Sequence, residues 1–410
     1  MKQLRRVSLA ALGVACLHLI FGAIVRISGS GMGCGDNWPK CYGYWIPPMS
    51  RPDLIVEVSH RYLASLLVLA VSAMALTAWA KRRELGVAGR GGPLRTAFGS
   101  VAAVFGAAIL GGVTVKLGNA PYATVAHWLM AMTLLALVGA TAIRAGALGG
   151  TGVRGQRGTS RAVQLGMGSA VLAILAVALG GMTAKYPGAA VGCTSFPGCG
   201  RNASVVPSSV LIQIVHRTIA FTLLGWVALS AVIMRRRRHL EAPVVVTAAY
   251  TAFALVVAQI VVAASMVLLH MPGVLRSLHE ATGVGIWLGS FTFAYLARLG
   301  ARAADPAIAE PSEPGVDAGE IRLTPPQPIA ATALVELEAP DPLVDHGLSL
   351  ESAFEPIVES TIDDVFHESV SPVVEQPKSP AEAIAEPPRA QPASGPQHSN
   401  IVIIARGADL

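Results

Sequence analysis

The sequence is poor in charge. Charged residues make up only 14% of its 410 residues and aromatic residues only 6%, whereas hydrophobic residues make up 53%. Soluble globular proteins carry roughly a quarter of charged residues. The composition therefore excludes the ordinary soluble class and predicts an integral membrane protein. We expect its surroundings to be a lipid bilayer, and we expect no nucleic-acid partner.

Acidic residues are almost absent from residues 1–302, which hold six Asp and Glu but 27 of the 31 Lys and Arg. Residues 303–410 hold the other 19 acids and are rich in Pro, Glu, Ala and Ser, without a sustained helical or strand period. This split predicts a basic membrane part followed by an acidic, disordered cytoplasmic tail. The first 27 residues also lack a small-residue cleavage site, so we expect a retained helix rather than a signal peptide.

Long apolar runs dominate the basic part. A helix needs about 20 apolar residues to cross a bilayer, and eight stretches qualify: roughly 7–27, 54–79, 96–116, 122–143, 162–184, 209–234, 244–268 and 275–298. Alternate connections are rich in Lys and Arg, such as "KRRELGVAGR" and "RRRRH". Because positively charged connections stay inside, we expect a multi-pass protein of a bacterial cell membrane with both termini in the cytoplasm.

Cysteine is scarce, and four of the five cysteines lie in the two connections predicted to face outward. Cys34 and Cys41 stand in "CGDNWPKC", and Cys193 and Cys199 stand in "CTSFPGC". Two local disulfides are the simple interpretation in an oxidising compartment. A metal site is the alternative, although neither pair has Cys-x-x-Cys spacing. Redox cycling of the first pair stays open. Cys16, inside the first span, is interpreted as a small packed residue.

The chain repeats itself with a period of roughly 155 residues. "GAIVRISGSGMGCGDNWPKC" (22–41) matches "GGMTAKYPGAAVGCTSFPGC" (180–199). The repeat predicts two tandem four-helix bundles, 1–150 and 151–302, followed by the tail 303–410. Because each unit has an even number of spans, the two halves are expected to point the same way.

Four histidines recur in this repeat, about five residues into the even-numbered spans and roughly 8 Å below the outer surface: His60, His127, His216 and His279. Ionisable residues inside a span are costly and usually functional. The alternative is that each imidazole is only a packed polar group. Two imidazoles facing each other in an apolar bundle suit the iron of a haem, whereas zinc would need further ligands. His18 has no counterpart in the fifth span and is interpreted as structural.

Charged neighbours distinguish the two halves. Three residues before the first histidine of each pair stands Glu57 in one half and Gln213 in the other. A carboxylate on the face of the histidine suits proton transfer, although an ion pair with Arg61 is an alternative role. Arg61 and Arg217 are expected either to pair with haem propionates or to reach the lipid headgroups. We expect Glu280 to pair with Arg276.

These features together resemble the haem A synthase family of the CtaA and Cox15 type. The resemblance rests on "EVSHR", the four histidines, the duplicated four-helix unit and the first-loop cysteine pair, and it covers residues 1–302. It implies an oxidoreductase that oxidises a methyl group of haem O to a formyl group, giving haem A for terminal oxidases. The tail has no counterpart in the family pattern.

Residue by residue, the resemblance implies that His60 and His127 hold the substrate haem O and that Glu57 assists catalysis. It implies a haem b cofactor on His216 and His279 in the second half. Cys34 and Cys41 match the first-loop pair of the family, and Cys193 and Cys199 match the second-loop pair of many bacterial members. Haem O synthase is an expected partner by pathway, together with an electron acceptor that the residues do not identify. Homo-oligomerisation is left open.

A di-haem membrane electron-transfer cytochrome is the alternative function, because it too would hold haem on two histidine pairs. The difference between Glu57 and Gln213 counts against it, as does the placement of all four histidines at one level. A relay across the membrane would need haems at two depths.

Overall fold

The computed structural model describes residues 1–155, 158–200 and 207–304, and the described part is helical without a named strand. The helices are α1 (Lys2–Ile27), α2 (Pro52–Ala80), α3 (Pro93–Lys116), α4 (Pro121–Arg144), α5 (Ser160–Lys185), α6 (Pro207–Arg236), α7 (Pro243–Leu268) and α8 (Gly273–Ala304), with short 3-10 helices η1 (Ser30–Met32), η2 (Ala147–Gly155) and η3 (Ala189–Val191). Eight helices of the described part are long and apolar enough to cross a membrane, as predicted. The predicted tail lies outside the described residues, apart from 303 and 304 at the end of α8.

Proline marks the beginning of several spans. Pro52, Pro93, Pro121 and Pro243 stand at the first helical position of α2, α3, α4 and α7. A helix tolerates proline there because the missing N–H would have no intrahelical acceptor. α5 begins differently, since the Thr159 side chain accepts a hydrogen bond from the Ala162 N–H at 3.3 Å.

Thr159 also donates its hydroxyl to Glu241 in the connection between α6 and α7, and so joins that connection to the start of α5. Burial raises the pKa of the Glu241 carboxyl, and the hydrogen bonds from Thr159 oppose this rise.

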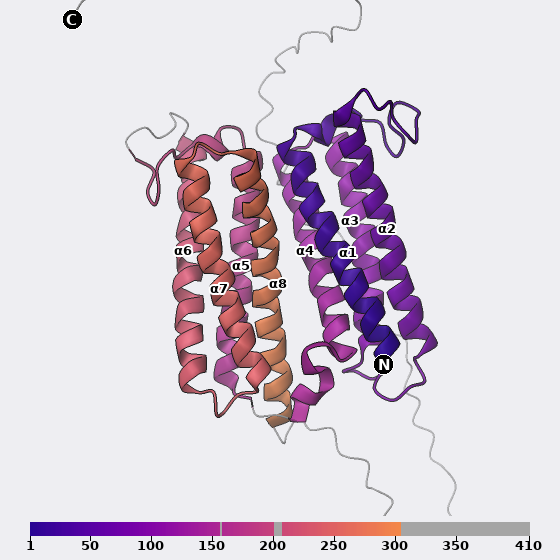
Figure 1. Cartoon of the computed structure of the whole chain (residues 1–410), viewed down its shortest axis with the longest axis vertical. Coiled ribbons are helices and arrows are strands. Elements are labelled where there is room, and N and C mark those ends of the chain that lie inside the picture. The colour runs from indigo at the N-terminus through magenta and orange to yellow at the C-terminus, as the bar shows by residue number, and fades with distance from the viewer. Residues whose placement is uncertain (156–157, 201–206, 305–410) are drawn as a thin grey trace, which may run out of the picture. The chain divides into compact units, whose positions relative to one another are not determined.

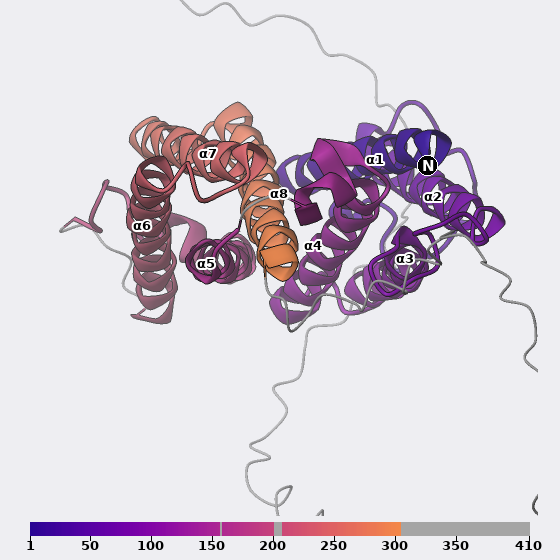
Figure 2. The ribbon, with the colours of Figure 1, turned by 90° about the horizontal axis from the view of Figure 1, so that it is seen from below.

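The eight helices form two groups of four that lie side by side (Figures 1 and 2). Within the first group α1 packs on α2 and α4, and α3 packs on α2 and α4; α5 to α8 repeat this pattern. The groups meet where α1 and α4 pack against α8 and α5. This pattern of contacts fits two equivalent halves that point the same way. The exact division at residue 150 stays a prediction.

Two of the helices at this seam, α4 and α8, are the most buried of the eight. In the most apolar 18-residue stretch of each helix, 56% of the residues of α4 and of α8 are buried, against 11% of those of α7. Two side chains fasten the seam: the Trp287 indole N–H donates to the Met132 carbonyl at 2.8 Å, and the Arg144 guanidinium bonds the Tyr295 hydroxyl. Elsewhere on the spans, large side chains such as Leu69, Ile109 and Val261 are exposed, as expected for a surface in contact with acyl chains.

Both connections predicted to face outward lie at one end of the helices, the upper end in Figure 1, where the even-numbered helices begin. The N-terminus lies at the other end (Figure 1). Multi-pass membrane insertion follows from the eight spans. Which compartment each end faces stays a prediction.

One close helix contact yields a test of the fold. A methyl group at Gly166 in α5 would lie 2.7 Å from the Ala294 Cα of α8, whereas one at Gly225 in α6 would meet nothing within 4 Å. Gly166→Ala should therefore lower the stability of the detergent-solubilised protein by about 1–3 kcal/mol through overpacking. Gly225→Ala should leave the thermal unfolding midpoint unchanged or raise it. Equal midpoints for the two variants would contradict the close approach of α5 and α8.

Candidate functional site

The four predicted histidines stand in the even-numbered helices, somewhat deeper than expected. His60 is the ninth residue of α2, His127 the seventh of α4, His216 the tenth of α6 and His279 the seventh of α8. At about 1.5 Å per residue they lie roughly 9–14 Å from the helix starts, instead of the expected 8 Å. The difference arises because α2, α6 and α8 each begin two residues earlier than the apolar stretches indicate.

Each half brings its own two histidines together. His60 and His127 are close enough to interact electrostatically, and so are His216 and His279. His127 points its Nδ1 at the Ala107 carbonyl oxygen, 2.9 Å away. Because a carbonyl can only accept, this contact places the proton on Nδ1 and leaves Nε2 with its lone pair. A metal-ligating imidazole usually has this arrangement.

The other three imidazoles have buried nitrogen atoms without a hydrogen-bond partner. The Nδ1 atoms of His60, His216 and His279 are all in this state, although the Ala176 carbonyl interacts weakly with His216. An unpaired polar group is costly in an apolar interior. Across the described residues, no cluster of three or more His, Cys, Asp or Glu is arranged as a metal cage. The pairing of two imidazoles within each apolar half, rather than the unpartnered Nδ1 atoms, fits an iron group held between two histidines.

Glycines make room beside three of these imidazoles. A methyl group at Gly22 would lie 3.2 Å from His60 Cε1, and one at Gly180 would lie 3.1 Å from the same atom of His216. Gly111 stands in the same relation to His127, at 3.3 Å. Without a Cβ, the odd-numbered helix can pack directly against the ring that its neighbour presents.

His18 is the main difference between the two histidine pairs. Its ring stacks on that of His60, with centroids 4.3 Å apart and planes 7° from parallel. In the repeat, Ala176 occupies the matching position, and no ring of the described residues stacks on His216. His18 is buried, and its Nδ1 has no hydrogen-bond partner. His18 is therefore a packed residue that also contacts His60, a predicted haem ligand. The sequence pattern did not indicate this contact.

Glu57 and Gln213 form hydrogen bonds that hold the outer connections on the histidine-bearing helices. Glu57, only 4% exposed, accepts a hydrogen bond from the Cys34 N–H at 2.8 Å and forms an ion pair with Arg61 at 2.5 Å. Gln213 donates to the carbonyl of Ala189 at 2.7 Å in the other half. The alternative ion-pair role of Glu57 is thus present. Its catalytic role stays a prediction.

Arg61 and Arg217 donate to backbone carbonyls of the cysteine loops. Arg61 reaches the carbonyls of Asn37, Pro39 and Lys40. Arg217 reaches those of Cys193, Ser195, Pro197 and Gly198. The predicted contact with haem propionates stays untested, and these loop contacts are a role that the sequence pattern did not indicate.

The structure forms both predicted disulfides. Cys34 and Cys41 have Cα atoms 5.0 Å apart, and Cys193 and Cys199 have theirs 4.4 Å apart. Cys16 is a free, partly buried cysteine, as expected.

The predicted partner of Glu280 was wrong. Glu280 pairs with Arg26 of α1 and not with Arg276 of its own helix. Arg26 also places its guanidinium carbon 5.9 Å from the Trp128 ring centroid. A sequence pattern finds neighbours along one helix, but this pair joins residues 254 positions apart. Gln259 of α7 was missed in the same way: its amide donates to the His279 carbonyl at 2.9 Å.

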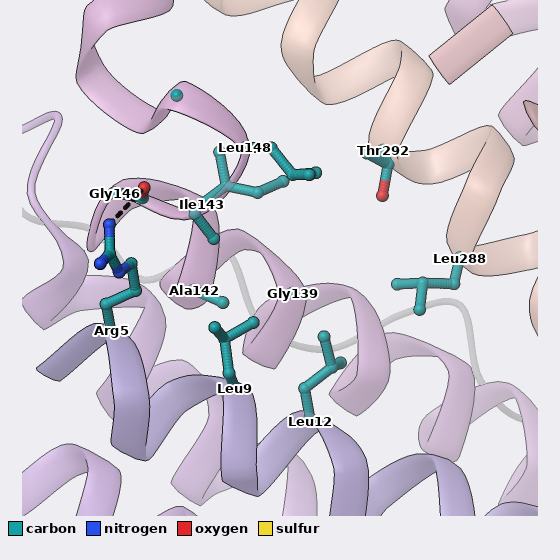
Figure 3. Close-up of a pocket in the computed structure, with 12 residues that line it drawn as sticks. Arg5, Leu9, Leu12, Gly139, Ala142, Ile143, Gly146, Leu148, Leu288 and Thr292 are labelled. Atoms are coloured by element: carbon teal, nitrogen blue, oxygen red, sulfur yellow. Dashed lines mark hydrogen bonds between the residues drawn. The ribbon is translucent and has the colours of Figure 1, made fainter. Parts of the chain in front are cut away.

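A cavity of about 640 Å³ lies at the opposite end of the molecule, where η2 meets α1, α4 and α8 (Figure 3). Leu9, Leu12 and Leu288 line it, with Arg5 at its edge. None of the predicted site residues is among its lining residues, so it is separate from the histidine pairs.

Known proteins match the helical part of this chain. The family model COX15-CtaA, described as cytochrome oxidase assembly protein, matches residues 5–291. A protein named Heme A synthase from Geobacillus thermodenitrificans is 26% identical over 292 residues, which are 69% of this chain and 88% of the relative. Another so named, from Geobacillus kaustophilus, is 27% identical over 61% of this chain and 77% of the relative. A third, from Shouchella clausii, is 40% identical over 20% of this chain and 28% of the relative.

The loop contacts of Arg61 can be tested directly. Arg61→Ala removes three hydrogen bonds to residues enclosed by the Cys34–Cys41 disulfide. A charged donor contributes about 1.5–3 kcal/mol per bond, so we expect dilute thiol to reduce this disulfide at least about tenfold faster. Alkylation followed by intact-mass measurement would give the rate. Arg51→Ala is the matched control, because among the described residues the Arg51 side chain bonds Asp53 and not the disulfide loop. An unchanged rate in Arg61→Ala would mean that these bonds do not hold the loop closed.

Proposed function

The chain belongs to the COX15-CtaA family, and we propose that it is a haem A synthase, an enzyme of haem biosynthesis that converts haem O to haem A. The observation that supports this most is the extent of the family match, because residues 5–291 include all four paired histidines and Glu57. The relatives named Heme A synthase support the same assignment.

We assign the substrate to the first half. His60 and His127 hold haem O, and the buried Glu57 carboxylate lies on the same helix face as His60, one turn away. In the structure its oxygens accept hydrogen bonds from the Arg61 guanidinium and from the Cys34 backbone N–H. Such a carboxylate can accept a proton released as the methyl group is oxidised. The outer loop above it is closed by a disulfide and limits the access of water.

We assign haem b to the second half, on His216 and His279. A bound haem b supplies one-electron redox chemistry. The neutral Gln213 in place of Glu57 suits this role, because its amide serves only to hold the Ala189 and Ala190 carbonyls. Oxidation of a methyl to a formyl group with oxygen taken from water releases four electrons and four protons, and a second haem beside the first half could carry these electrons one at a time toward an external acceptor. The electron acceptor beyond it is not identified by any residue.

We also propose a location for the enzyme and a source for its substrate. The enzyme spans a bacterial cell membrane with both termini in the cytoplasm, and its substrate comes from haem O synthase. A di-haem electron-transfer cytochrome is the second candidate, and the repetition of the histidine pair in both halves favours it.

Haem analysis of the wild-type chain and of Glu57→Gln separates a haem A synthase from a di-haem electron-transfer cytochrome. Expressed in membranes that make haem O but lack haem A, the wild-type chain should yield haem A, as measured by extraction and chromatography of the haems. Glu57→Gln should accumulate haem O and lose about 10²-fold or more of the haem A formed, the usual effect of removing a general base. Asp53→Asn, which changes a partly exposed acid one turn away in the same helix, is the control and should retain full conversion. Haem B alone, without haem A from the wild type, would favour the electron-transfer cytochrome.

His216→Ala tests the assignment of haem b. Removing one ligand of the second half should deplete haem B from the purified protein, while haem O held by the first half remains measurable in the extract. His127→Ala should have the reverse effect on the two haems. If both substitutions deplete the same haem, the assignment of one haem to each half is wrong.

A further inference from the structure

Three cations meet one carboxylate where the outer ends of α1, α5 and α8 come together. We call Arg26, Lys185, Arg276 and Glu280 the seam cluster. Arg26 forms the ion pair with Glu280 described above and interacts electrostatically with both Arg276 and Lys185. The cluster thus joins both halves of the molecule, since α1 belongs to the first and α5 and α8 to the second.

The charges of this cluster do not balance. The Arg26 and Glu280 side chains are only 14% and 23% exposed. Lys185 and Arg276 have no acidic partner within the described residues, and the buried Nε of Arg26 has no hydrogen-bond acceptor. Like charges repel strongly where the effective dielectric constant is low. An anionic group bound here would relieve this repulsion and accept the spare N–H donors.

The seam cluster adjoins the second pair of histidines. Arg276 stands one helical turn before His279, and Glu280 directly follows it. Arg26 is close enough to His279 to interact electrostatically with it. A group held by His279 would therefore lie next to the unbalanced cations.

We propose that the seam cluster binds the propionate carboxylates of the haem held by His216 and His279. Two carboxylates would balance the three cations that Glu280 alone does not. Carboxylates also suit arginine, which donates two parallel N–H bonds to them. The donors of Arg217 already serve four loop carbonyls, whereas the seam cluster has donors to spare. This inference rests on the proposed binding of haem in the second half and deepens it.

The test compares haem B with its dimethyl ester, which lacks the two negative charges. Full-length protein is produced in haem-deficient cells in a His127→Ala background, so that only the second half binds haem. Each haem is titrated into the membranes, and the absorption change gives its dissociation constant. The parent chain should bind haem B about tenfold or more tightly than the ester, as charge-assisted hydrogen bonds require. Arg26→Gln and Arg276→Gln should each reduce this preference to within about twofold.

Arg298→Gln is the matched control, because Arg298 is an exposed arginine near the opposite end of the same helix. It should keep the full preference. A parent chain that binds haem B and the ester equally, or variants that keep the parent preference, would overturn the inference while leaving haem binding intact. An anionic lipid at the seam would give this same lack of discrimination. A parent chain that takes up neither haem would overturn the proposed haem site as well.

Glu280→Gln keeps the test decisive if an arginine variant fails to fold. It removes the competing carboxylate without removing a cation, so the preference for haem B over the ester should rise above that of the parent chain. An unchanged or lower preference would mean that the arginines serve only the ion pair and do not contact the haem.

Discussion

A polar group below the lipid surface has no water to bond, so the protein itself must supply its partner. This constraint accounts for most polar contacts near the outer end of the bundle. Glu57 and Gln213 bond the connections above them, and Arg61 and Arg217 bond the carbonyls of those same connections. These contacts fix the loops on the helices that present the histidines. Among the described residues, the Nδ1 atoms of His60, His216 and His279 are buried without a hydrogen-bond partner.

The two halves satisfy this constraint with the same backbone elements but with different side chains beside the histidines. Each has a 3-10 turn, a disulfide loop and an arginine that holds the loop. In the first half a buried carboxylate stands one turn from the histidine, and His18 stacks on that histidine. In the second half a neutral amide and Ala176 take these places. Equivalent backbones thus carry unequal side chains beside the histidines, and the proposed division into a substrate half and a haem b half rests on this difference.

Features that repeat along the chain were predictable. The eight spans follow from runs of apolar residues, and both disulfides follow from short cysteine spacing in connections between spans. The pairing of His60 with His127 follows from the duplicated unit. Contacts between helices distant in sequence were not predictable, because no local period relates them. The Glu280 partner was therefore assigned to the wrong arginine, and the contact of His18 with His60 was missed.

The sequence by itself determined the class of the molecule, its number of spans and its four paired imidazoles, since these depend on composition and on spacing within single helices. Only the tertiary structure decided which charges meet. Arg26 pairs with Glu280 across the seam because α1 and α8 pack together there. The roles of Gly22 and Gly180 likewise become clear only from the His60 and His216 rings that lie beside them. Such contacts depend on how neighbouring helices are rotated about their axes, and side-chain packing between helices sets that rotation.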